Sequence, residues 1–234
     1  MRSLILAAAA ALLASPAIAA PGVNIHDGGW TNVMRSGEEM IDGSGRIVRL
    51  ARTAAPFRAI RLEGPASVEF VAGATLSIEV EADDNLQGLL TTEIADGVFR
   101  IDTRGSFRTR HVPVVRVTAP SLDSLRARGS GDVNIRGIDE RTLSIVLHGS
   151  SDINVEGRAD EAAVALYGSG VIDVTSVRSP RMTVALYGSG DARVRTDEEL
   201  SAVVYGSGNI EYAGEPRWLN ERVLGTGEIR RLGR

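Results

Sequence analysis

The feature that most constrains the fold is a five-residue signature that recurs six times in the second half of the chain. Each copy begins with Gly-Ser or Gly-Thr and ends in an acidic, amide or apolar residue followed by an apolar one. The copies stand at residues 129–133, 149–153, 168–172, 188–192, 206–210 and 225–229. A self-similar period near twenty residues is typical of a solenoid, in which one coil cannot bury its apolar face without its neighbours.

The segments beside each signature alternate between apolar and polar or small residues. Leu143, Ile145 and Leu147 precede the second copy, and Ile153 and Val155 follow it. This is the period of a β-strand, while glycine suits a corner with positive φ and a serine hydroxyl can bond a nearby backbone group. We therefore predict an all-β chain that folds as a single-stranded parallel β-helix (a β-solenoid), right-handed, with about 19–20 residues per coil. A flexible Gly-Ser linker, the alternative, would lack the alternating Val and Ile.

Two columns of residues test this register. The fifth residue of each signature is expected to face the core, and it is apolar in all six copies: Val133, Ile153, Ile172, Ala192, Ile210 and Ile229. The next residue points outward in this register, and its last four members, Asp173, Arg193, Glu211 and Arg230, alternate in charge. Neighbours one coil apart are expected to pair in this way.

The first residues have the pattern of a secretory signal peptide. Arg2 supplies a positive charge, residues 4–13 are apolar, and residues 17–19 form an Ala-x-Ala cleavage site. We predict a signal peptide at residues 1–19, an exported mature chain, and no transmembrane segment in that mature chain. The protein would then be periplasmic, at the cell surface or secreted; an uncleaved anchor is the alternative.

The mature chain divides by pattern into three parts. Residues 20–45 are poorly patterned and are predicted to form an N-terminal arm. Residues 46–234 are predicted to be one β-solenoid domain, with irregular N-terminal coils at residues 46–125 and regular coils at residues 126–234. The irregular strands would cap the solenoid, since an uncapped coil exposes unpaired backbone. Within them, Asp96-Gly97 predicts a hairpin turn, and residues 72–74 a hairpin or a coil corner.

The order of these segments resembles a known family. Strand-like stretches at residues 57–62, 68–71, 75–80, 96–101 and 115–122 precede the repeated corners, and residues 208–216 read Gly-Asn-Ile-Glu-Tyr-Ala-Gly-Glu-Pro. This pattern is similar to the putative auto-transporter adhesin, head GIN domain family of exported bacterial proteins, over residues 54–232. The resemblance implies a single-stranded β-helix outside the cytoplasm and no particular activity.

Composition and motifs argue against several kinds of site. The formal charge of −4 does not favour a nucleic-acid partner, and the absence of cysteine rules out disulfides. The acidic column Asp132, Asp152, Asp191 and Glu228 is interrupted by Val171, and its spacing is not the nine-residue repeat of a calcium roll, so we expect no metal or cofactor. His26, His111 and His148 stand in unrelated contexts and no catalytic motif is present, so we predict no catalytic residues.

The residue before each corner forms the candidate binding column. It reads Arg128, His148, Tyr167, Tyr187, Tyr205 and Leu224. Because Leu166 and Leu186 beside it point inward, His148, Tyr167, Tyr187 and Tyr205 should stack on the outside, where aromatic side chains can hold a glycan or an envelope protein. We predict an exported, non-catalytic interaction or adhesion domain. The alternatives are a ladder that only stiffens the solenoid, a structural component of the cell envelope, or a carbohydrate-active β-helix enzyme.

Overall fold

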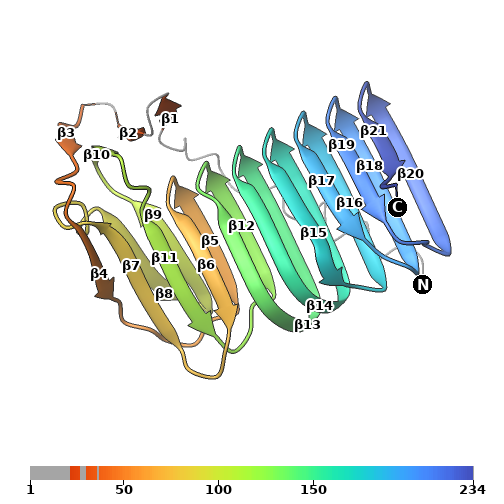
Figure 1. The fold of residues 1–234 in the computed structure, drawn as a ribbon, viewed down its shortest axis with the longest axis horizontal. Helices are drawn as coiled ribbons and strands as arrows, with labels where there is room; N and C mark the ends of the chain where they lie inside the picture. The colour runs from red at the N-terminus through yellow and green to blue at the C-terminus, as the bar shows by residue number, and fades with distance from the viewer. Residues whose placement is uncertain (1–21, 27–29, 36, 234) are drawn as a thin grey trace.

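The computed structural model describes residues 22–26, 30–35 and 37–233, which form strands, turns and irregular segments and no helix. The strands stack in a row along one long axis (Figure 1), as the prediction of a β-solenoid requires. The predicted signal peptide at residues 1–19 lies outside the described residues.

The strands have the following bounds: β1 (Gly22–His26), β2 (Trp30–Met34), β3 (Met40–Asp42), β4 (Ile47–Ala51), β5 (Ala59–Gly64), β6 (Ser67–Ala72), β7 (Ser77–Asp83), β8 (Leu90–Ala95), β9 (Val98–Thr103), β10 (Ser106–Thr109), β11 (Val114–Ala119), β12 (Ser124–Gly129), β13 (Val133–Gly149), β14 (Asp152–Gly168), β15 (Val171–Arg178), β16 (Arg181–Gly188), β17 (Asp191–Arg195), β18 (Glu199–Gly206), β19 (Asn209–Ala213), β20 (Trp218–Gly225) and β21 (Glu228–Arg231).

Each regular coil contributes one strand to each of two faces. The strands that run into the corner glycines form what we call the leading sheet: β9, β5, β12, residues 142–149 of β13, residues 161–168 of β14, β16, β18 and β20, all parallel. The strands that follow the corners form the trailing sheet: β11, β6, residues 133–136 of β13, residues 152–158 of β14, β15, β17, β19 and β21, also parallel. The two sheets join through β13 and β14, which belong to both.

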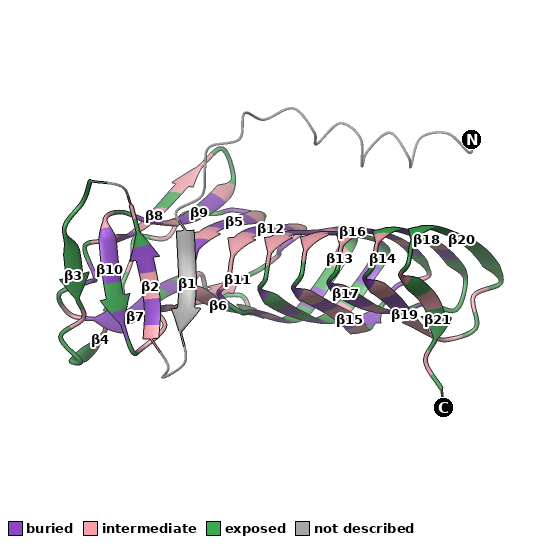
Figure 2. Cartoon of the chain, turned by 90° about the horizontal axis from the view of Figure 1, so that it is seen from above, coloured by how far each residue is buried: buried purple, intermediate pink, exposed green. Residues whose placement is uncertain are grey.

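The core lies between the two sheets (Figure 2). The predicted inward column is buried at Val133, Ile153, Ile172, Ala192 and Ile210, while Ile229 in the last coil is only half-buried. On the outer side, Arg193 Nε lies 3.0 Å from Glu211 Oε2 and Arg230 also pairs with Glu211. Neighbouring coils therefore meet through apolar contacts inside and alternating charges outside, as the register predicts.

Backbone atoms hold the corners together. The amide nitrogen of Ser189 donates to the carbonyl oxygen of Gly168 at 3.0 Å, and Ser207 donates in the same way to Gly188 at 2.9 Å. In the described part of the chain, the corner serine hydroxyls do not form the expected hydrogen bonds to the backbone. The hydroxyls of Ser130 and Ser151 are buried without a hydrogen-bond partner. The stacked amides already satisfy the corner carbonyls, which leaves the hydroxyls without that role.

The N-terminal end contains a further corner that lacks the Gly-Ser-Gly signature. β5 ends at Gly64, and Pro65 and Ala66 lead into β6, so that Gly64 pairs in register with Gly129. The turn at residues 72–74 does not close a hairpin, because β11 lies between β6 and β7, parallel to the first and antiparallel to the second. The turn predicted at Asp96-Gly97 does close a hairpin, between β8 and β9.

Antiparallel strands surround this end. β4 pairs with β7, and β8 pairs with β9, at the margins of the two sheets. A separate small sheet has the strand order β1-β2-β10-β3, and it includes the part of the predicted N-terminal arm that the structure describes as strands. Val33 and Phe107 of this sheet pack with Leu86 in a second small core.

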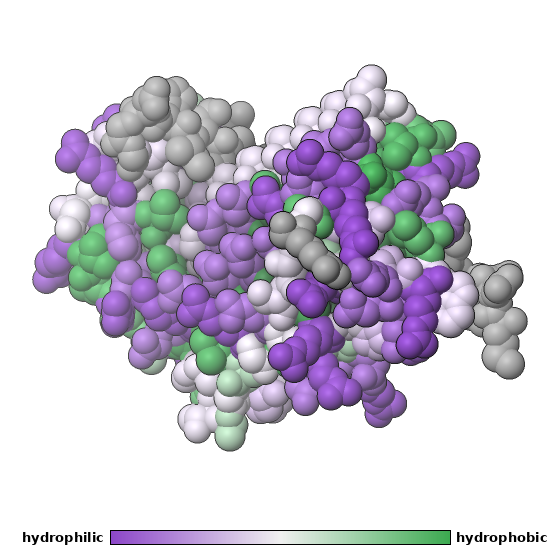
Figure 3. All heavy atoms as spheres, turned by 45° about the vertical axis from the view of Figure 1, so that its right-hand side comes forward, coloured by the Kyte–Doolittle hydropathy of each residue, from purple (hydrophilic) through white to green (hydrophobic). Residues whose placement is uncertain are grey.

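The other end, formed by β20 and β21, has no further coil stacked on it among the described residues. Leu219 and Val223 continue the inward rows of the previous coil but are 43% and 42% exposed. Trp218, on the outer side, is 63% exposed. Figure 3 turns this end forward and shows hydrophobic side chains beside strongly hydrophilic ones.

Candidate binding face

The four ring side chains singled out from the sequence form one continuous stack on the outside of the leading sheet. Parallel pairing places His148 beside Tyr167, Tyr167 beside Tyr187, and Tyr187 beside Tyr205. The ring centroids are 4.6, 4.8 and 4.9 Å apart in that order, and the ring planes differ by 6°, 3° and 2°. We call these four residues the ring ladder.

The ring ladder presents edges rather than faces to solvent. Because successive rings are parallel and in contact along the solenoid axis, the face of each inner ring is turned toward its neighbour. Tyr187 and Tyr205 are nevertheless 38% and 39% exposed, so their outer edges are accessible. The stack therefore offers a row of ring edges and hydroxyl groups repeated at about 4.8 Å, the spacing of neighbouring strands.

A column of small apolar side chains runs beside the ring ladder. It consists of Val146, Ala165, Ala185 and Val203, which pair in register two residues before the rings. Val146 is buried and the other three are half-buried. The outer surface next to the rings is therefore flat and uncharged, because no long side chain rises from this column.

The environment of two members of the ring ladder, His148 and Tyr187, favours their neutral forms. Burial lowers the pKa of His148 below its ordinary value, and the positive charges of Arg128 and Arg126 lower it further. Burial raises the pKa of the Tyr187 hydroxyl, and the flanking Tyr167 and Tyr205 raise it further. Both shifts favour the neutral form of the side chain.

Charged and apolar residues end the column on its two sides. Beyond His148, the register continues to Arg128 and then to Glu63, and beyond Tyr205 it continues to Leu224. Sequence reasoning missed Glu63 because the corner that follows it reads Gly-Pro-Ala. The glycine at residue 64 was the one signal that could have revealed it.

Carboxylates of the acidic column that follows the corners accept hydrogen bonds from backbone amides of the next coil. Asp191 Oδ1 accepts a hydrogen bond from the amide nitrogen of Asn209 at 3.1 Å, and Asp132 Oδ1 accepts one from Asp152 at 3.4 Å. In the part of the chain that the structure describes, no group of three or more His, Cys, Asp or Glu side chains is arranged to hold a metal ion. These carboxylates therefore join neighbouring corners.

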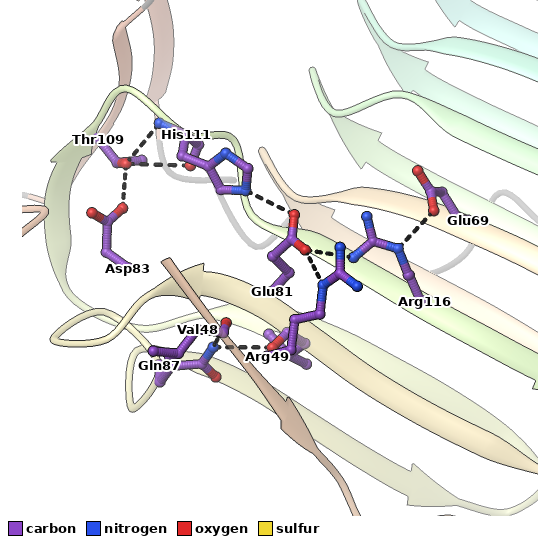
Figure 4. A network of polar contacts seen from close by, with 10 residues as sticks. Val48, Arg49, Glu69, Glu81, Asp83, Gln87, Thr109, His111 and Arg116 are labelled. Carbon is purple, nitrogen blue, oxygen red and sulfur yellow. Dashed lines mark hydrogen bonds and ion pairs between the residues drawn. The ribbon is translucent and has the colours of Figure 1, made fainter. Parts of the chain in front are cut away.

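A second polar cluster, which sequence reasoning did not identify, lies on the trailing sheet at the N-terminal end (Figure 4). The buried carboxylate of Glu81 on β7 accepts hydrogen bonds from Arg49 on β4 and, at 2.9 Å, from Arg116 on β11, and it lies 3.1 Å from His111 Nε2. Hydrogen bonds from the two arginines, Arg49 first, lower the pKa of Glu81 in spite of its burial. This cluster joins three strands of the cap.

Three solved structures share this fold. Crystal structures of putative adhesins from Bacteroides fragilis NCTC 9343 and Parabacteroides merdae ATCC 43184 match with TM-scores of 0.67 and 0.56 at 22% and 19% identity; the matches cover 82% and 83% of this chain and 100% and 99% of theirs. A putative lipid binding protein from Parabacteroides distasonis ATCC 8503 matches with a TM-score of 0.52 at 22% identity, over 83% of this chain and 100% of that one.

Two further comparisons concern the sequence. No curated protein matches it. The model of the family described as putative auto-transporter adhesin, head GIN domain, matches residues 56–216, which is more than half of the chain. The resemblance noted from the segment order is thereby confirmed, and the chain belongs to the putative auto-transporter adhesin, head GIN domain family.

Proposed function

We propose that this protein is an exported, non-catalytic adhesion domain that binds a glycan of the cell envelope through the outer surface of the leading sheet. The observation that carries the proposal is the ring ladder, whose hydroxyl-bearing edges lie in one straight row beside a flat apolar column. A glycan chain laid along this row would meet repeated hydroxyl groups and apolar surface together, because a tyrosine side chain combines an apolar ring with a hydrogen-bonding group.

Membership of the family and the names of the similar structures favour adhesion over catalysis. The signal-peptide pattern of residues 1–19 supports export. No apolar helix long enough to cross a bilayer occurs in the described ranges. We place the mature protein in the periplasm or at the cell surface, and cell fractionation with an antibody against the mature chain checks this placement.

The exposed edges of the ring ladder allow a sharp test of binding. Tyr187→Phe removes a hydroxyl and keeps the ring, so it should leave the stack and the free energy of unfolding nearly unchanged. We expect it to weaken binding to an array of bacterial envelope glycans, because one member of the hydroxyl row is gone. Tyr212→Phe is the matched control, since Tyr212 lies on β19 of the trailing sheet, away from the ring ladder.

The outcomes separate the alternatives left open by the sequence. If both variants bind glycans as strongly as the unaltered protein, the ring ladder only stiffens the solenoid and does not bind the glycan. Binding to an envelope protein in a pull-down, with no signal on the glycan array, would replace the proposed ligand class. New reducing ends in the incubated glycans would indicate an enzyme instead.

A further inference from the structure

A cavity at the N-terminal end of the leading sheet is rich in arginine. Its volume is about 860 Å³, within the range of small-molecule sites. β8, β9, β5 and β12 contribute to its wall, together with segments near residues 35, 52, 87–88 and 104. Six arginines line it: Arg35, Arg52, Arg61, Arg100, Arg104 and Arg128.

The carboxylates around this cavity are too few to neutralise the arginines. Glu63, Glu93 and Asp102 also line it, so six positive side chains face three negative ones, an excess of three positive charges. Glu63 forms an ion pair with Arg61, in which Oε1 lies 2.8 Å from Nε. Asp102 Oδ1 lies 3.9 Å from Arg35 Nη2. Among the described residues, the guanidinium groups of Arg100, Arg104 and Arg128 have no ion-pair partner.

The strand register places like charges side by side in this region. Arg61 on β5 is paired with Arg100 on β9 on one side and with Arg126 on β12 on the other. Like charges on directly neighbouring strand positions repel. In the regular coils the same outward position holds Val146, Ala165, Ala185 and Val203, which shows that the position itself does not require a charge.

Two of the arginines also carry unsatisfied donors. The Nε atoms of Arg35 and Arg52 are buried and have no hydrogen-bond partner in the described part of the chain. Arg52 is held in place because its Nη2 donates to the backbone oxygen of Gln87 at 3.0 Å and to its Oε1 at 2.7 Å. Buried donors are normally paired, so donors left over beside a cavity point to a ligand acceptor.

We propose that this cavity binds a small oxyanionic ligand, one that carries phosphate or carboxylate groups. The guanidinium fork matches both groups by paired hydrogen bonds. The cavity adjoins the ring ladder, whose column continues into it through Arg128 and Glu63, but the proposal does not depend on the adhesion role proposed above.

The test is calorimetric titration of the full chain at low ionic strength with inorganic pyrophosphate, with a uronic-acid trisaccharide and with a neutral trisaccharide. We expect saturable binding of at least one anionic probe, and whichever binds identifies the phosphate or the carboxylate source. The neutral sugar should not bind, and added salt should weaken the binding that is seen. Arg100→Gln should weaken it by about tenfold or more, since it removes a charged donor.

Arg222→Gln is the matched control. Arg222 occupies the same outward column at the far end of the leading sheet, three residues before its corner glycine, and has no arginine beside it in the register. It should leave anion binding unchanged. Because Arg100 is exposed and has no ion-pair partner in the described chain, Arg100→Gln should keep the melting temperature of the unaltered protein. Failure of both anionic probes to bind, or equal weakening by Arg222→Gln, would overturn the proposal.

Discussion

The carbonyl oxygen of Gly168 lies 2.3 Å from the position that a Cβ atom on Gly188 would occupy. The two glycines stand at the same corner of successive coils, and Gly188 has a φ of +136°. Glycine is therefore required here for two reasons, because the backbone conformation disfavours a side chain and the previous coil leaves no room for one. The repeated signature is thus a steric requirement of stacking coils.

Gly188→Ala should lower the free energy of unfolding by about 3 kcal/mol or more, since it adds a backbone clash to conformational strain. Gly97→Ala is the control, because Gly97 has a φ of +72° and no atom within 4 Å of an added Cβ. It should cost only about 1–2 kcal/mol, the strain alone. Urea unfolding measures both values, and equal costs would mean that the clash relaxes.

The ring ladder predicts a graded loss of stability. Tyr187 has a ring on both sides, whereas Tyr205 has Tyr187 on one side and Leu224 on the other. With about 0.5–1.5 kcal/mol for each ring pair, Tyr187→Ser should lose about 1–3 kcal/mol through lost stacking and Tyr205→Ser about half of that. If chemical denaturation gives the same loss for both variants, stacking does not govern their contribution.

The lowered pKa of His148 predicts a dependence of stability on pH. The folded protein takes up the proton at a lower pH than the unfolded chain, whose histidine pKa is about 6.5. The unfolded state binds more protons between these two values, so the free energy of unfolding should fall as pH decreases below about 6.5 and level off below the folded pKa. Above about 6.5 this group contributes no slope.

His148→Gln is the variant that isolates this contribution, because glutamine does not titrate. The difference in unfolding free energy between pH about 7.5 and pH about 5.5 should be smaller in the variant than in the unaltered protein. If the change in unfolding free energy between the two pH values is the same in both proteins, the stack does not lower the pKa of His148.

The Glu81 cluster predicts loss of stability at acidic pH. Arg49 and Arg116 lower the pKa of Glu81, so its stabilising effect is present above the carboxylate pKa of the unfolded chain and is lost as pH falls through the folded value. Glu81→Gln should lower the unfolding free energy at neutral pH by about 1–3 kcal/mol through weaker charged hydrogen bonds.

Glu79→Gln on the same strand is the control, because Glu79 is exposed, makes no ion pair within 4 Å in the described residues and acts on Arg49 only at longer range. It should change the unfolding free energy by less than about 0.5 kcal/mol. Thermal unfolding followed at neutral and acidic pH compares the two variants, and an acid dependence that survives in Glu81→Gln would assign it to other carboxylates.

Part of the candidate surface could be read from the sequence because it depends on local periodicity. Alternation of apolar residues with period two places Leu186 inward, and Tyr187 then has to lie outward. The corner glycine that directly follows each of Tyr167, Tyr187 and Tyr205 indicates that they occupy the same position in successive coils, although the repeats differ in length. The sequence does not reveal that the ring faces cover one another and that only the ring edges are exposed. Ring orientation depends on the contacts between coils, which only the structure shows.

The cap could not be read in the same way. Nothing in residues 72–74 reveals that β11, about forty residues later in the chain, inserts between β6 and β7. Likewise, Arg61, Arg100 and Arg126 belong to three separate segments, and only the pairing of β5 with β9 and β12 gathers them.

The sequence by itself determined the solenoid, its six repeated corners and the side of each regular strand that faces the core, because these follow from short-range periodicity and from the conformations that glycine allows. Only the tertiary structure decided the order of the N-terminal strands, the corner at Gly64 and the arginine-lined cavity. The physical reason is that these features depend on hydrogen bonds between strands distant in the chain, whose partners are chosen by packing and not by any local pattern.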